Sequence, residues 1–71
     1  MTFVDYYDYR DKDLSTWHAC PMRPPLLVDM FNERIDWLSD RPGQRFFLQP
    51  MAGAFWFESK DDALLYRLHW G

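Results

Sequence analysis

The chain has 71 residues, with eleven acidic and eight basic side chains and a formal net charge of −3 at pH 7. A chain of this length has room for one hydrophobic core. Its acidity argues against a protein that holds phosphates by general electrostatic attraction, and no apolar run is long enough to cross a membrane, so we expect one small soluble domain.

Aromatic side chains are abundant. Six Phe, four Tyr and four Trp make up 20% of the residues. Each buried aromatic side chain removes roughly 150–250 Å² from water, so this number exceeds what one small core can hold. We therefore expect some of these rings at the surface, as contacts for a partner.

The cysteine content and the first residues of the chain indicate the cellular compartment in which the protein acts. Cys20 is the single cysteine, and the first residues show no basic segment followed by an apolar one. A small domain without a disulfide framework and without a secretory signal is typical of a reducing compartment. We expect a cytoplasmic protein.

The N-terminal third is predicted to contain one strand and one loop. Residues 2–9 are rich in aromatic and β-branched side chains and lack Gly and Pro, which predicts a strand with tyrosines on both faces. Residues 10–24 mix charges with prolines, which predicts a loop with one helical turn at residues 14–19. Trp17 is expected to hold this loop against the body of the domain.

Residues 26–39 predict the main helix, with Pro25 in its first turn and residues 41–43 as its stop. Besides the expected core stripe, the helix has a second apolar flank. This flank either packs against the rest of the domain, helped by the Arg34 stem, or forms a contact surface for a partner. The flank contains Leu26, Met30 and Trp37, and the core stripe contains Leu27, Val28, Phe31, Ile35 and Leu38.

Residues 45–58 predict a β-hairpin whose loop is residues 50–53. If Gln49 lies opposite Ala54, the alternation of strands places one apolar set on the core face and the pair Phe47 and Trp56 on the other face. The hairpin is then apolar on both sides, and something should cover the second side. The core set is Phe46, Leu48, Phe55 and Phe57.

The last segment predicts a helix that begins after Ser59, with Asp62 at its third position. Residues 66–70 also alternate with a period of two and could instead form a short strand; we expect the helix. The two apolar flanks of this helix both call for burial. One consists of Ala63, Tyr66 and Trp70, and the other of Leu64, Leu65 and Leu68.

The predicted fold is therefore a single α+β domain over residues 1–71, in the order strand, helix, hairpin, helix. A hairpin alone is marginally stable, so residues 2–9 are expected to add a third strand. The two helices are expected to pack mainly on one face of this three-stranded sheet.

No catalytic or metal-binding pattern is present. His18, Cys20 and His69 do not follow a zinc spacing, and nothing marks Cys20 as an activated nucleophile. The sequence has no phosphate-binding glycine loop and no serine elbow. We therefore expect neither an enzyme nor a cofactor or metal site.

Residues 5–13 interleave four carboxylates with three tyrosines. They form either a solvated edge strand protected by its charge or an acidic surface that docks on basic patches of another protein. The residues expected to contact a partner are Trp56, Phe47, Tyr6, Tyr7, Tyr9, Asp5, Asp8, Leu26, Met30 and Trp37.

Residues 55–71 (FWFESKDDALLYRLHWG) resemble the ending of many small uncharacterised tailed-phage proteins, with an aromatic strand, a polar turn, Asp-Ala and a closing Leu-x-Trp. Tyr66 and His69 stand where Phe and Arg are more usual. The resemblance implies an accessory protein that acts in the cytoplasm of a bacterial host by occupying a host protein, such as a CRISPR effector, another defence protein or the transcription machinery.

These observations predict a non-enzymatic protein-binding module, an inhibitor of a bacterial host protein. One alternative is a self-assembling phage structural or accessory protein, in which the hairpin or the Leu26, Met30 and Trp37 flank forms a homodimer. Another is a single-stranded nucleic-acid binder that stacks bases on Phe47 and Trp56, which the negative charge disfavours.

Overall fold

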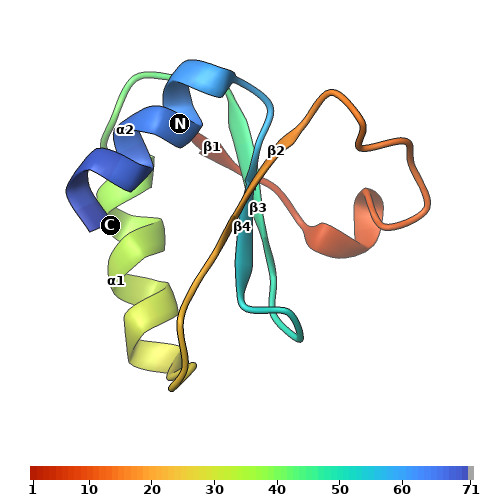
Figure 1. The fold of residues 1–71 in the computed structure, drawn as a ribbon. Helices are drawn as coiled ribbons and strands as arrows, with labels where there is room; N and C mark the ends of the chain where they lie inside the picture. The colour runs from red at the N-terminus through yellow and green to blue at the C-terminus, as the bar shows by residue number, and fades with distance from the viewer. Residues whose placement is uncertain (71) are drawn as a thin grey trace.

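The computed structural model describes residues 1–70 and consists of a mixed four-stranded sheet with two α-helices on one face. The strand order is β1-β3-β4-β2. Figure 1 shows α1 and α2 on one side of the sheet and the segment around η1 on the other. The elements are β1 (Thr2–Phe3), the 3₁₀ helix η1 (Tyr6–Asp8), β2 (His18–Pro21), α1 (Val28–Ser39), β3 (Arg45–Gln49), β4 (Ala54–Phe57) and α2 (Lys60–Trp70).

The α+β class is confirmed, but the sheet has four strands and not three. The additional strand is β2, which pairs antiparallel with β4, so that Cys20 lies opposite Phe55. We expected a loop with a helical turn here. A turn does form, since the Trp17 amide donates to the Leu14 carbonyl, but the chain then extends along the free edge of β4. This pairing overrides the mixed local sequence.

The expected strand over residues 2–9 ends at Phe3. β1 runs parallel to β3, and the Val4 amide still donates to the Phe46 carbonyl. The Asp5 carboxylate then accepts a hydrogen bond from the Tyr7 amide and caps η1. Aspartate offers the backbone this local alternative to a sheet ladder, which turns the chain away from β3.

The hairpin has the predicted register. Gln49 pairs with Ala54, and Phe47 pairs with Trp56. The loop closes at Gly53, whose φ of +61° favours glycine. The predicted core face is also confirmed, because Phe46, Leu48, Phe55 and Phe57 are all buried.

The two helices cover this core face. Leu38 of α1 is fully buried, and Ala63 and Tyr66 of α2 are buried beside it. The last segment is helical through Trp70, which confirms the helix over the alternative strand. Phe31, Ile35, Met30 and Trp37 are partly buried and pack against the core.

Two positions of the expected core stripe are wrong. Leu27 is 55% exposed and Val28 is 68% exposed, because α1 begins only at Val28 and Leu27 is an extended N-cap residue outside the helix. No helix among the described residues is long and apolar enough to cross a membrane.

Candidate protein-interaction surface

The face of the sheet opposite the helices is covered by the N-terminal segment. Phe47 lies at its centre with no exposed surface. The Tyr9 ring stacks on Phe47 at 5.6 Å between centroids, and Trp17 and Tyr6 pack beside it at 5.2 and 6.0 Å. The expected cover of the second hairpin face is therefore present, and Trp17 does hold its loop against the body. Phe47 itself is out of reach of a partner.

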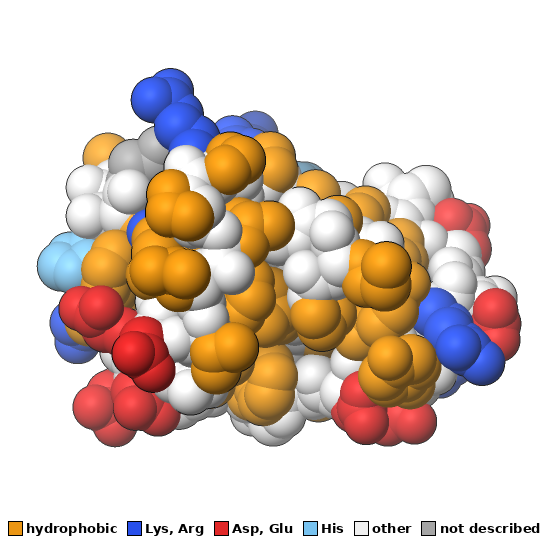
Figure 2. Space-filling model, turned by 90° about the horizontal axis from the view of Figure 1, so that it is seen from below, with side chains coloured by type: hydrophobic (Ala, Val, Ile, Leu, Met, Phe, Trp, Pro, Cys, Tyr) orange, Lys and Arg blue, Asp and Glu red, His pale blue; other side chains and the backbone are white. Residues whose placement is uncertain are grey.

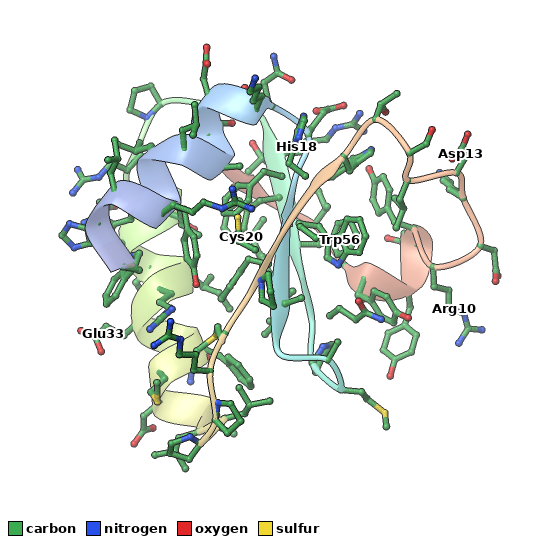
Figure 3. The ribbon with its side chains drawn as sticks, in the orientation of Figure 1. Arg10, Asp13, His18, Cys20, Glu33 and Trp56 are labelled. Carbon is green, nitrogen blue, oxygen red and sulfur yellow. The ribbon has the colours of Figure 1, made fainter. Side chains whose placement is uncertain are left out.

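Trp56 also belongs to this covered face. Its ring stacks on Phe47 with an angle of 9° between the ring planes, and its indole nitrogen donates to the Gln49 side chain at 3.1 Å. Trp56 is half-buried and lies on the side of the sheet that faces η1 (Figure 3). Its aromatic surface is largely committed to neighbours within the chain.

Arg45 fastens the cover to the sheet. Its guanidinium forms an ion pair with Glu58 and donates to the Tyr9 hydroxyl at 2.9 Å. The hydrogen bond from Arg45 lowers the pKa of Glu58 below its usual value, and Glu58 in turn raises the pKa of Arg45. The three side chains link β3, β4 and the N-terminal segment.

The outward side of the N-terminal segment carries the acidic and tyrosine side chains. Tyr7 is 65% exposed, and Asp5 and Asp8 are exposed beside it. Arg10 and Asp13 point away from the sheet (Figure 3). The four carboxylates of residues 5–13 are therefore exposed, but they lie on a 3₁₀ helix and turns and not on the expected edge strand.

A shallow cavity of about 480 Å³ separates this segment from the end of the hairpin. Phe3 and Tyr7 line it on one side, and Leu48 and Pro50 line it on the other. Asp5 lies at its wall. Because residues of both the N-terminal segment and the hairpin line this one cavity, the two segments form one continuous surface.

The same end of the molecule exposes apolar side chains from α1 and the hairpin loop. Met51 at the loop is 96% exposed, and Leu27 and Val28 lie at the start of α1. Leu26 rests directly on the loop, because a Cβ placed on Gly53 would lie 2.6 Å from its Cδ1. We call this surface the lower apolar face; it consists of Phe3, Tyr7, Leu26, Leu27, Val28 and Met51.

Figure 2 views the molecule from this end and shows hydrophobic side chains across much of it, with acidic side chains at its margins. Two of the predicted contact residues, Tyr7 and Leu26, belong to this face. Sequence reasoning missed Leu27 and Val28, which it assigned to the core, and Met51, which it treated as a loop residue. The hairpin prediction alone placed Met51 at a loop tip, and an apolar residue at such a tip was the signal to use.

The predicted contact flank of α1 is divided by the structure. Met30 and Trp37 pack against the core, and the Trp37 ring stacks on His69 of α2 at 4.2 Å. Only Leu26 faces outward at the lower apolar face. The Arg34 guanidinium lies over the ring of Trp70 of α2, so the flank serves mainly to join the two helices.

α2 exposes a second, smaller apolar stripe. Leu68 is 85% exposed, Leu64 is 45% exposed, and Leu65 is 37% exposed. The expectation that both flanks of this helix are buried is wrong for this flank. The flank that contains Ala63 and Tyr66 packs against the sheet. The sheet is too small to cover the leucine flank as well.

Cys20 and His69, which were considered as metal ligands or as a nucleophilic pair, pack against other parts of the domain and not against each other. Cys20 is buried between the sheet and α2 (Figure 3), its sulfur lies 4.0 Å from the Ala63 carbonyl oxygen, and burial raises the pKa of its thiol. His69 stacks on Trp37, away from Cys20. Within residues 1–70, no three His, Cys, Asp or Glu side chains gather closely enough to hold a metal ion.

Comparisons of the chain with protein-family models, with curated proteins and with solved structures found no match.

Proposed function

We propose that this chain is a non-enzymatic protein-binding module that covers a surface of another protein with its lower apolar face. The observation that supports the proposal is the exposure of Leu27 and Val28 at the start of α1 and of Met51 at the hairpin loop, two segments that touch where Leu26 rests on Gly53. Apolar patches of this kind on a small domain mark interaction sites, because leaving them in water costs free energy that a partner recovers.

The charges around this face define the partner. Asp5 and Asp8 flank the exposed Tyr7, and Asp29 is exposed in the first turn of α1. A protein interface commonly has an apolar centre and a polar rim, and complementary charge directs the encounter. The partner surface is therefore apolar at its centre and basic at its edge.

The identity of the partner rests on a different observation. The resemblance of residues 55–71 to tailed-phage proteins supports a host protein in the bacterial cytoplasm, which the chain inhibits by occlusion. A defence effector, such as a CRISPR complex, and the transcription machinery are the candidates. Both bind nucleic acid through basic surfaces, which suits the acidic rim.

The test is capture from a nuclease-treated bacterial lysate with a C-terminally tagged chain. The variant Val28→Asp/Met51→Asp places two charges on the lower apolar face at side chains that are 68% and 96% exposed, so its fold is retained. Leu68→Asp is the control, because it places one such charge on a comparably exposed apolar residue of α2.

We expect one stoichiometric host protein with the unchanged chain and with Leu68→Asp, and its loss with the double variant. Competition by the captured protein's own nucleic acid would then test occlusion directly. Capture that survives the double variant would refute the assignment of this face.

A second candidate function is self-assembly, which the leucine stripe on α2 favours. Leu64, Leu65 and Leu68 are all exposed on one helix, and a symmetric pairing of two such helices would hide the stripe without a foreign partner. Light scattering coupled to size-exclusion chromatography decides this. A dimer that becomes a monomer in Leu68→Asp would establish self-assembly, and a monomeric unchanged chain would exclude it at the concentration used.

The nucleic-acid alternative receives no such support. Stacking of bases needs open aromatic faces, whereas Phe47 is fully covered and Trp56 is half-buried against it.

A further inference from the structure

A cavity of about 460 Å³ lies between the two helices and the segment that connects β2 to α1. Arg23 and Pro25 of the connecting segment, Met30 and Arg34 of α1, and Tyr66 and Trp70 of α2 all line it. Figure 1 shows the connecting segment running beside α1 on the side of the sheet that carries both helices. The cavity shares no residue with the lower apolar face.

The charge of this cavity is opposite to that of the chain. Of the residues that the structure describes, two arginines line it and no acidic residue does, although the chain carries a net charge of −3. Among residues 1–70, neither Arg23 nor Arg34 has a carboxylate partner, since the ion pairs formed there are those of Arg10 and Arg45. Arg34 is half-buried, so its charge is only partly hydrated.

The polar groups around Arg34 are also donors. The Arg34 guanidinium donates to the Tyr66 hydroxyl at 2.6 Å, which leaves the hydroxyl proton to be donated to another group. Tyr66 is only 3% exposed, and burial raises the pKa of its hydroxyl and so keeps that proton in place. The indole nitrogen of Trp70 is buried as well and has no hydrogen-bond partner in the described part of the chain.

A half-buried guanidinium without a carboxylate partner among residues 1–70 and a buried hydroxyl with a proton to donate therefore line the same cavity. Buried donors are normally paired, and an unpaired one costs free energy that a bound acceptor recovers. The apolar walls, Pro25, Met30 and the Trp70 ring under the guanidinium at 4.7 Å, accommodate an apolar body attached to that acceptor.

We propose that this cavity binds a carboxylate carried on a small apolar or aromatic body. One nitrogen of the Arg34 guanidinium is occupied by Tyr66, and the remaining donors of its planar fork match the two oxygens of a carboxylate. The carboxylate belongs either to a free acid or to the carboxyl terminus of a polypeptide. The proposal is independent of the lower apolar face and of its partner.

The test is an NMR titration of the ¹⁵N-labelled full chain with benzoate, N-acetylphenylalanine and their neutral amides. The four tryptophans give four indole signals, and the variant Trp70→Phe identifies that of Trp70. We expect the Trp70 signal to shift saturably with both carboxylates and not with the amides, while the Trp56 signal stays in place. The tighter of the two carboxylates indicates the source of the natural ligand.

Two variants and one control locate the site. Arg34→Gln removes the guanidinium and is expected to weaken benzoate binding by at least about tenfold. Tyr66→Phe keeps the ring in the core and removes only the hydroxyl proton, so it is expected to weaken binding by about three- to tenfold. Arg41→Gln, which removes a guanidinium stacked on Trp37 outside the cavity, is expected to change nothing.

Equal shifts with benzoate and benzamide, or unchanged binding in both Arg34→Gln and Tyr66→Phe, would overturn the proposal. Because Tyr66→Phe preserves the packed ring, it decides the matter even if Arg34→Gln fails to fold. Phenyl phosphate is the last probe, and binding tighter than that of benzoate would refute the assignment to carboxylates.

Discussion

Phe47 gives the sharpest test of how the sheet is covered. Its ring has no exposed surface and is enclosed by Tyr6, Tyr9, Trp17 and Trp56. Hiding roughly 150 Å² of aromatic surface at about 25 cal/mol per Å² is worth about 4 kcal/mol. Phe47→Ala is therefore expected to lower the free energy of unfolding by about 3–5 kcal/mol, because the enclosing rings close the cavity only in part.

This loss is a large share of the total. A chain of 71 residues has a free energy of unfolding of roughly 4–11 kcal/mol. With a urea m value of about 1 kcal/mol per M, the midpoint of urea unfolding is expected to fall by roughly 3–5 M. Tryptophan fluorescence reports the transition. Phe47→Leu retains most of the side-chain volume and is expected to cost less than about 2 kcal/mol.

The control for this measurement is Met51→Ala, at a side chain that is 96% exposed. We expect it to change the free energy of unfolding by less than about 0.5 kcal/mol. If Phe47→Ala costs no more than this control, the N-terminal segment does not cover the sheet, and Phe47 would be open to a partner as the sequence predicted.

Three further predictions concern the turn, the ion pair and the thiol. Gly53→Ala is expected to cost about 1–2 kcal/mol in thermal unfolding, because φ is +61° and the new Cβ would meet the Leu26 methyl groups at 2.6–2.7 Å; an equal cost in a Leu26→Ala background would assign the whole effect to the backbone. Arg45 lowers the pKa of Glu58, so the stability from this pair is complete above the ordinary value of 4.5 and is lost as the pH falls through the lowered pKa. On acidification, the urea midpoint of Glu58→Gln is therefore expected to fall less than that of the unchanged chain. The difference is expected to be small and to disappear at high salt. Identical pH profiles of the two chains would contradict this. Cys20 is 2% exposed and burial raises its pKa, so its reaction with an aromatic disulfide reagent at pH 8 is expected to be at least about tenfold slower in the native chain than in urea; equal rates would show that the thiol is accessible.

The hairpin was predictable because all of its determinants are local. The alternation of residues 46–48 and 55–57 and a glycine-containing loop fix the register, and the pleat then decides which rings share a face. The need for a cover over Phe47 followed from the same register. What covers it was not predictable, because Tyr6, Tyr9 and Trp17 reach Phe47 only after a chain reversal that Asp5 begins.

The candidate surface was predicted less well than the fold. A helical wheel gives the direction of a side chain around its own axis, but it does not tell where along that axis the neighbouring sheet ends. Leu27 has the wheel angle of the buried Leu38, yet it is the extended N-cap residue that precedes α1, and both Leu27 and Val28 are exposed. Likewise, β2 has no distinctive alternation, and its strand conformation depends on the free edge of β4.

The position of the hairpin at the centre of the sheet has a consequence for synthesis. β1 and β2 leave the ribosome first, but both pair only with strands of the hairpin, which is made later. The first 44 residues thus have no sheet partner during translation, and Leu38 has no core to enter until the hairpin is present. At about 5–20 residues per second the remainder follows within seconds, so the chain completes its fold only after the last strand has emerged. A nascent chain that stalls before residue 57 would display its tyrosines and tryptophans to chaperones and proteases.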